Sequence, residues 1–215
     1  MTSPISPRAI LIDLDGTLAD SLSVMRIAYR RFLEQFQVEP SDAEFDSLNG
    51  PPLPEVVRRL KGSHALEGAE EMLLANYYDV IDQSYGGVVP RHGAIDLLQM
   101  AKKNHCTVGI VTSNSAKRTL TWLETVSLSH LIGFIVSGDE LKHGKPHPEP
   151  YLLASKKALC PAAEIVAVED SSQGARSAVD AGLKTFILIH GDSSHSWPDS
   201  AVPINSLVEL SKQLW

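Results

Sequence analysis

Cysteine is scarce in this chain, and the two that are present, Cys106 and Cys160, lie far apart in the sequence. They form no C-x-x-C motif, so neither a disulfide framework nor a zinc site is indicated. Reduced, partly buried thiols are the simpler interpretation. We therefore expect a protein of the reducing cytosol, that is, a cytoplasmic location.

Long apolar runs and a signal sequence are also missing. Residues 1–8 are polar and contain proline, whereas an export signal requires an apolar segment there. The aliphatic runs further along the chain are far shorter than a membrane span. We expect a soluble, unexported protein without a membrane partner.

Positive charge is in short supply, because 19 Lys and Arg residues stand against 26 Asp and Glu residues and give a net charge of −7 at pH 7. No local cluster of Lys and Arg compensates for this, so we expect no nucleic acid among its partners. The length of 215 residues and the hydrophobic share of 43% are sufficient for one substantial core.

What the chain does contain is a regular alternation of short aliphatic runs with segments of helical periodicity. The runs cover residues 9–12, 107–111, 134–136, 165–168 and 185–189. Helices are predicted over residues 93–104, 115–125, 148–159, 172–181 and 206–214. This alternation predicts an α/β fold with a parallel sheet and right-handed crossovers. Residues 192–203 are rich in Ser and Pro and are interpreted as a loop before the last helix.

The interval between residue 17 and about residue 88 breaks this rhythm, because it contains no strand-like run. A simple crossover between parallel strands needs far fewer residues. Apolar residues recur there at three-to-four spacing, for example Tyr29, Phe32 and Leu33, as in an amphipathic helix. We interpret the interval as an inserted helical cap domain that rests on the core.

Two aspartates follow the first aliphatic run, in the segment Asp13-Leu14-Asp15-Gly16-Thr17. Period-two alternation aims both carboxylates into one small volume. Two like charges so close together require a cation or a shared proton. Taken alone, the pair is equally compatible with an ordinary strand end, since Asp and Gly are common in turns.

The next three aliphatic runs also lead into polar groups. Thr112 follows the second run, Lys145 lies in the loop after the third, and Glu169 and Asp170 follow the fourth. Each is compatible alone with a helix cap, a solvated cation or a turn. Because ligands of such sheets bind outside the carboxyl ends of the strands, the set as a whole indicates phosphoryl transfer.

The chemistry of these groups is complementary. Carboxylate oxygens from Asp13, Asp15 and Asp170 suit Mg²⁺, and Lys145 can screen a phosphate dianion from a second side. Thr112 and backbone N–H groups can bind phosphoryl oxygens. We expect Asp13 to attack phosphorus and form an aspartyl-phosphate. Asp15 then protonates the leaving oxygen and afterwards deprotonates the attacking water.

With these motifs the chain resembles the haloacid dehalogenase-like superfamily of phosphohydrolases. The resemblance rests on residues 13–17, Thr112, Lys145 within Gly-Lys-Pro, and Glu169-Asp170. It implies a Rossmann-like core of residues 1–17 and 88–215 with a helical cap of residues 18–87. It also implies Mg²⁺ held by Asp13, the main-chain carbonyl of Asp15, and Asp170, with Glu169 either binding the ion or supporting its ligands.

Two comparisons with the family patterns indicate which branch of the superfamily this chain resembles. Dehalogenases of this superfamily carry no aspartate at the position of Asp15, whereas phosphatases and phosphomutases do. Phosphonate-cleaving members use a cap lysine, and here the cap has only Lys61, which follows two arginines. We therefore expect a phosphatase or a phosphomutase.

The cap segment 48–53, Leu-Asn-Gly-Pro-Pro-Leu, is similar to that of phosphoglycolate phosphatases and lacks the arginine that sugar phosphomutases place shortly after the glycine. This favours hydrolysis. Phosphoglycolate-type sequences often carry Asn and then Lys where this chain has Ser113-Asn114, so the substrate stays open. Candidate substrate-binding residues are Gly16, Thr17, Ser113, Asn114 and the cap residue Arg58.

Two groups of histidines are interpreted as surface residues: His143 and His147 beside Lys145, and His190 with Asp192 and His195. The sequence therefore predicts a Mg²⁺-dependent phosphatase for a small phosphorylated metabolite. The alternatives are a sugar phosphomutase of the β-phosphoglucomutase type and a non-catalytic binding member of the fold. The oligomeric state is not indicated.

Overall fold

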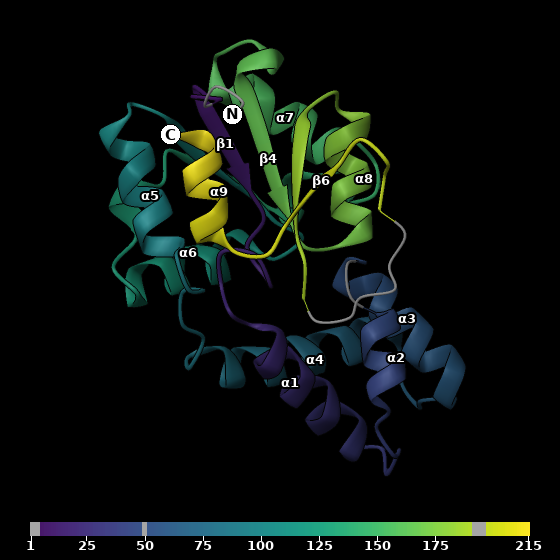
Figure 1. Ribbon diagram of the computed structural model, residues 1–215. Helices are drawn as coiled ribbons and strands as arrows, with labels where there is room; N and C mark the ends of the chain where they lie inside the picture. Colours follow the sequence, from purple (N-terminus) through teal and green to yellow (C-terminus); the bar gives the residue numbers. More distant parts are fainter. Residues whose placement is uncertain (1–4, 49–50, 191–196) are drawn as a thin grey trace.

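The computed structural model describes residues 5–48, 51–190 and 197–215. A sheet covered by helices forms one part of the molecule, and a group of helices lies beyond one end of the sheet (Figure 1). No helix in the described part of the chain is long and apolar enough to cross a membrane. The cytoplasmic location stays a prediction.

Within the described residues, one six-stranded sheet has the order β3-β2-β1-β4-β5-β6, and every neighbouring pair is parallel. The strands are β1 (Ala9–Ile12), β2 (Thr107–Val111), β3 (Phe134–Val136), β4 (Ile165–Glu169), β5 (Lys184–Leu188) and β6 (Val202–Ile204). The central strand β1 is buried along its whole length, as its uniformly aliphatic sequence requires.

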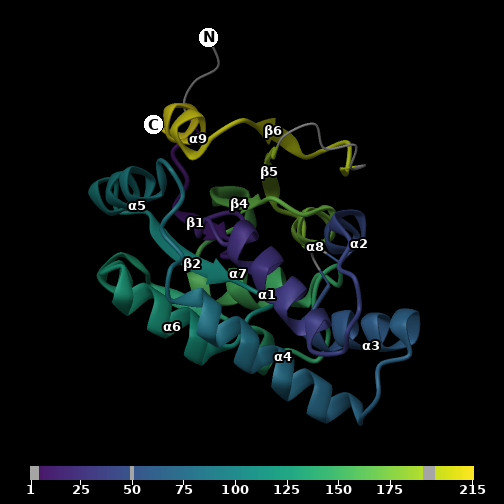
Figure 2. The ribbon, with the colours of Figure 1, turned by 90° about the horizontal axis from the view of Figure 1, so that it is seen from below.

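Helices cover both faces of this sheet (Figure 2). They are α5 (Ala94–Lys103), α6 (Ala116–Thr125), α7 (Glu149–Ala158), α8 (Ser172–Asp180) and α9 (Leu207–Leu214). Because side chains alternate along a strand, Ile10 and Ile12 belong to the core cluster that contains Leu97 of α5 and Leu207 of α9. Leu11 belongs to a second cluster with α7 and α8.

Four further helices in the described residues lie beyond the carboxyl ends of the strands: α1 (Leu22–Glu34), α2 (Asp42–Ser47), α3 (Leu53–His64) and α4 (Glu70–Tyr85). The long helices α1 and α4 pack together, and the rings of Phe32 and Tyr77 stack with their centroids 4.5 Å apart. All four helices fall within residues 18–87, and the division into core and cap domains stays a prediction.

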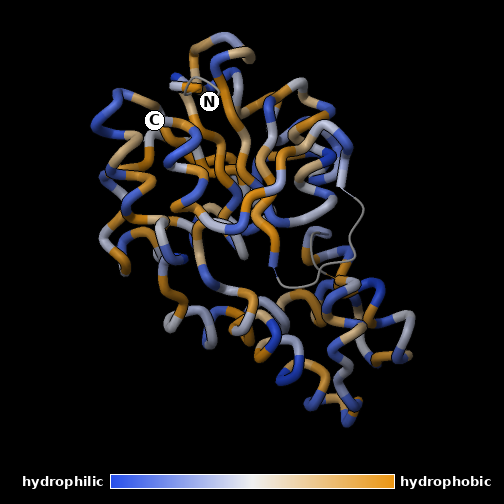
Figure 3. The backbone as a smooth tube through the Cα atoms, in the orientation of Figure 1, coloured by the Kyte–Doolittle hydropathy of each residue, from blue (hydrophilic) through white to orange (hydrophobic). Residues whose placement is uncertain are grey.

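The predicted parallel α/β fold is confirmed, and each predicted strand and core helix lies within one or two residues of its expected position. The hydropathy colouring follows the same pattern, because the strands are mostly hydrophobic and much of the outer helical surface is hydrophilic (Figure 3). Cys106 and Cys160 are both free thiols.

One strand in the described part of the chain was not predicted. Residues 202–204 form strand β6, although we expected residues 192–203 to be a loop. The strand is three residues long, has Pro203 at its centre and pairs only with β5 at the edge of the sheet. Proline is tolerated in an edge strand because its missing N–H faces away from the ladder. Because proline is rare in strands, the sequence of this segment did not predict one.

Candidate active site

The predicted polar residues converge because their strands are neighbours. Asp13 directly follows β1, Thr112 follows β2, and Glu169 and Asp170 end and follow β4, with β1 between the other two strands. Lys145 comes from the loop between β3 and α7. Parallel strands place all of their carboxyl ends at one edge of the sheet, so one crevice receives the set.

Lys145 is the cationic centre of this set. Its Nζ lies 2.5 Å from Oδ1 of Asp13, donates to the carbonyl of Val111 at 2.9 Å, and forms an ion pair with Glu169. Burial disfavours its charge, but the charges of Asp13 and Glu169 outweigh burial and hold the pKa of Lys145 above its ordinary value. Lys145 is therefore a fixed positive charge.

Asp13 is buried beside that charge. Burial raises the pKa of its carboxyl well above the usual range, and Lys145 acts in the opposite direction by favouring the carboxylate. Glu169 and Asp170 are close enough to raise the pKa of Asp13 further. A buried carboxylate among other acids is stable only when positive charge is supplied nearby.

Asp13, Glu169 and Asp170 offer carboxylate oxygens that lie within 4.8 Å of one another. Asp170 accepts the hydroxyl of Thr17 on Oδ1 at 3.2 Å, while its buried Oδ2 accepts no hydrogen bond from the described residues and lies 3.4 Å from Nε2 of His190. Gly16 makes room for this oxygen, since a Cβ there would lie 2.1 Å from Oδ2. A buried carboxylate oxygen without a hydrogen bond, within a cluster of acids, fits a hard divalent cation.

Glu169 is held by two hydroxyl groups, and the sequence did not point to one of them, Tyr151. The phenol of Tyr151 in α7 donates to Oε1 at 2.7 Å, and burial raises the pKa of Tyr151, so the phenol keeps its proton. Ser171 donates to Oε2 at 3.3 Å. Gly174 leaves room for the carboxylate, because a Cβ at Gly174 would lie 2.0 Å from its carbon.

Asp15 lies apart from this acidic cluster. Tyr85, the last residue of α4, donates its phenol proton to Oδ1 at 2.6 Å, and the amide of Asn114 donates to Oδ2 at 3.0 Å. The structure therefore does not bring the Asp15 carboxylate together with Asp13, Glu169 and Asp170. Its main-chain carbonyl as a metal ligand stays a prediction.

Thr112, Ser113 and Asn114 line the same cavity as Asp13 and Asp15. The hydroxyl of Thr112 accepts the backbone N–H of Asn114 at 3.0 Å. Its own proton thus remains available to a phosphoryl oxygen. Gly16 and Thr17 are not among the residues that line the cavity. Thr17 donates its hydroxyl to Asp170, and Gly16 makes room for the Asp170 carboxylate.

The cavity has a volume of about 130 Å³ and lies between the strand ends and helices α1 to α4. Arg58 does not line it, because its exposed guanidinium pairs with Glu55 at 2.5 Å and lies 3.7 Å from Glu70. The arginine that does line it is Arg118 of α6, which sequence reasoning missed. Arg118 pairs with Asp82 at 2.6 Å and donates to Asn114 at 2.5 Å.

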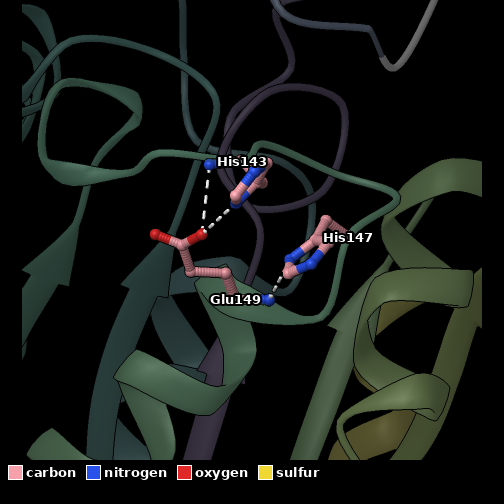
Figure 4. Close-up of side chains that lie close together, drawn as sticks. All are labelled: His143, His147 and Glu149. Carbon is pink, nitrogen blue, oxygen red and sulfur yellow. Dashed lines mark hydrogen bonds and ion pairs between the residues drawn. The ribbon is translucent and has the colours of Figure 1, made fainter.

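The histidines divide into two cases. His143 and His147 are exposed as predicted, and they surround Glu149 at the start of α7, where His143 Nδ1 lies 2.8 Å from Oε2 (Figure 4). His190 is not a simple surface residue, because its Nε2 hydrogen-bonds the carbonyl of Gly16 at 2.9 Å. The remaining residues of the two predicted groups, Asp192 and His195, lie outside the described residues, as do residues 49–50 of the cap segment.

Comparison with known proteins identifies the family that the active-site residues indicate. A model of haloacid dehalogenase-like hydrolases matches residues 10–188. Validoxylamine A 7'-phosphate phosphatase from Streptomyces hygroscopicus subsp. limoneus is 26% identical, over 94% of this chain and 95% of the relative. A phosphoglycolate phosphatase from Pseudomonas fluorescens is 27% identical, over 86% of this chain and 70% of the relative.

A solved structure shows the same fold. The crystal structure of CbbY from Rhodobacter sphaeroides in complex with phosphate has a TM-score of 0.81 and 24% sequence identity, and the match covers 95% of this chain and 96% of that one. The chain therefore belongs to the haloacid dehalogenase-like hydrolase family, and its phosphatase relatives confirm the predicted enzyme class, a phosphoric monoester hydrolase.

Proposed function

We propose that the protein is a Mg²⁺-dependent phosphatase that hydrolyses a small phosphomonoester through a phosphoryl group carried on Asp13. The observation that supports this is the position of the Asp13 carboxylate. It lies at the cavity, 2.5 Å from the buried ammonium of Lys145 and within the acidic cluster, while Asp15 lines the same cavity with a separate set of donors.

Asp13, Glu169 and Asp170 would hold the Mg²⁺ ion, with the main-chain carbonyl of Asp15 as the further ligand that the family pattern implies. When bound, the ion offsets negative charge on the carboxylates and on the phosphoryl group. The buried oxygen of Asp170, which accepts no hydrogen bond from the described residues, supports this assignment.

The residues of the chain divide the reaction between them. Lys145 favours the ionised form of Asp13 and attracts the phosphoryl oxygens, and Thr112 donates its hydroxyl proton to one of them. A carboxylate oxygen of Asp13 bonds to phosphorus as the bond from phosphorus to the ester oxygen breaks, and Asp15 protonates the departing alkoxide. Asp15 then removes a proton from water, which attacks phosphorus, releases phosphate and restores Asp13.

The side chains of the cap favour hydrolysis over phosphomutase activity. A sugar phosphomutase must hold a second, hydroxyl-rich sugar against the cap during transfer, which requires several polar partners. In the described part of the chain, the side chains that α1 to α4 contribute to the cavity are apolar or aromatic. The predicted cap cation Arg58 is directed to Glu55 instead.

Hydrolysis of a panel of phosphomonoesters, with and without Mg²⁺, tests the proposal. We expect Mg²⁺-dependent release of free phosphate, and a loss of more than about 10³-fold in kcat for Asp13→Asn, as for other nucleophile substitutions. Asp96→Asn, an exposed change on α5, is the matched control. Wild-type activity in Asp13→Asn would disprove the nucleophile, whereas glucose 6-phosphate formed from glucose 1-phosphate would identify a mutase.

A further inference from the structure

The cap side of the active-site cavity is apolar, whereas the core side is charged. Met25, Tyr29, Phe45, Val56, Tyr77 and Ile81 are among the cap residues that line it, and they come from all four cap helices. Every charged residue that lines the cavity in the described part of the chain belongs to the core. A bound phosphoryl group would therefore contact charged side chains of the core, and the group attached to it would contact apolar side chains of the cap.

The two cations that line the cavity are already engaged. Lys145 is bound to Asp13 and Glu169, and Arg118 is bound to Asp82 and Asn114. A leaving group with its own carboxylate or second phosphate would be buried without a free counter-charge among the described residues. Burial of an unpaired charge is strongly unfavourable.

Of the cap tyrosines that line the cavity, Tyr29 and Tyr77 offer few hydrogen bonds to a hydroxyl-rich group, while Tyr78 is half-buried under the guanidinium of Arg118. Tyr29 donates its hydroxyl to Glu44 at 2.5 Å and accepts the backbone N–H of Ser41 at 3.1 Å, and neither Glu44 nor Ser41 lines the cavity. Tyr77 is 3% exposed, and its ring stacks on Phe32. A sugar would lose hydrogen bonds to water against this wall, whereas an apolar group would lose none.

The size of the cavity limits the apolar group. Its volume of about 130 Å³ includes the space beside Asp13 and Lys145 at the strand ends, so the phosphoryl group takes part of it and the attached group must be small. We propose that the enzyme is selective for phosphomonoesters whose alcohol carries one small apolar group, such as an arylmethyl or short branched alkyl group. This inference rests on the proposed phosphatase function and extends it to a substrate class.

A kinetic comparison of three primary-alcohol esters tests the preference. Benzyl phosphate, glucose 6-phosphate and phosphoglycolate all release a primary alkoxide, so differences in kcat/KM report recognition of the attached group. With Mg²⁺ present, we expect kcat/KM for benzyl phosphate to exceed each of the others by about 10-fold or more. This is the discrimination expected when a hydrophobic pocket is filled by an apolar group in one substrate and not in the other. Equal or faster turnover of either polar ester would overturn the inference.

A binding measurement separates this inference from the proposed reaction. Benzylphosphonate and phosphonoacetate share a P–CH₂ unit and differ in carrying a phenyl ring or a carboxylate, and neither is hydrolysed as an ester. We expect calorimetry to show benzylphosphonate binding about 10-fold more tightly. That result supports the selectivity even if no ester is turned over, and equal or weaker binding overturns it even if phosphatase activity is present.

A pair of adjacent valines in α3 supplies matched variants. Val56 lines the cavity, whereas Val57, which is also buried, does not. Val56→Thr places a hydroxyl in the apolar wall and should lower the ratio of benzyl phosphate to glucose 6-phosphate kcat/KM by roughly fivefold. Val57→Thr should leave that ratio unchanged. An unchanged ratio in Val56→Thr, or the same change in both variants, would contradict the assignment of the wall.

Discussion

The charged side chain of Lys145 is buried and cannot reach solvent. Its side chain is 3% exposed, and its ammonium joins Asp13 to Glu169 while donating to the carbonyl of Val111. Lysine at this position therefore contributes to the fold as well as to the proposed reaction, because its removal leaves two buried carboxylates without their partner.

We predict that Lys145→Gln lowers kcat/KM by about 10²-fold, in the range of a lost electrostatic contact in a buried site. It should also lower the free energy of unfolding by about 3–5 kcal/mol. Lys142→Gln, an exposed change in the same loop, is the control. Steady-state kinetics and urea unfolding measure both effects, and a Lys145→Gln enzyme within twofold of wild type would refute the role.

Gly174 shows how closely the acids are packed. A methyl group there would overlap the buried carboxylate of Glu169, whereas one at Gly62, also inside a helix, would meet nothing within 4 Å. We predict that Gly174→Ala destabilises the protein by about 1–3 kcal/mol. Gly62→Ala should stabilise it by up to about 1 kcal/mol through helix propensity. Urea unfolding measures both, and equal shifts would show that the crowding is absent.

Among the elements, α4 and α6 are joined by side-chain contacts beside the cavity. Arg118 of α6 is buried and pairs with Asp82 of α4, and its guanidinium also lies over the ring of Tyr78, 5.2 Å from the centroid. Tyr85 at the end of α4 bonds Asp15. Helix α4 therefore contacts both Arg118 in the cavity wall and Asp15, the proposed proton donor.

We predict that Asp82→Asn raises KM about threefold and changes kcat less, because the partly exposed ion pair contributes about 1 kcal/mol or less to holding α4 against α6 at the cavity wall. Asp79→Asn is the matched control, since Asp79 is exposed on the same helix. Steady-state kinetics with benzyl phosphate separates KM from kcat. The same change in both variants would show that the Arg118 contact does not affect substrate binding.

At the scale of the whole molecule, the sequence was sufficient for five of the six strands in the described residues and for most of the residues at the edge of the sheet. Aliphatic runs and helical periodicity located the strands and core helices, and polar groups at the ends of neighbouring strands had to meet. Tyr85 and Tyr151 were missed because periodicity identifies a buried face but not the partner of a phenol 70 or 18 residues away.

The arginines illustrate the same limit. The cluster of charge around Arg58 suggested a substrate contact, but charges one turn apart on a helix pair with each other, and Glu55 takes both Arg58 and Arg59. Arg118 gave no sequence signal, because its partners Asp82 and Tyr78 come from a distant helix. Which arginine faces the cavity is decided by packing.

Metal binding should be visible in global stability. We predict that saturating Mg²⁺ raises Tm by about 5–10 °C, since a ligand at 100 times its Kd contributes about 2.7 kcal/mol to the folded state. Asp170→Asn should remove most of that shift, and Asp180→Asn, an exposed change on α8, should retain it. Thermal unfolding with and without Mg²⁺ makes the measurement. Equal shifts in the two variants would place the ion elsewhere.

The central claim is that Asp13 carries the phosphoryl group, and mass spectrometry of the acid-quenched enzyme tests it most directly. During turnover of benzyl phosphate with Mg²⁺, we expect one added phosphoryl group on the peptide that contains Asp13 and none in Asp13→Asn. The adduct should form and disappear at least as fast as kcat. Turnover without that adduct, or an adduct on another residue that forms at the rate of turnover, would contradict the account.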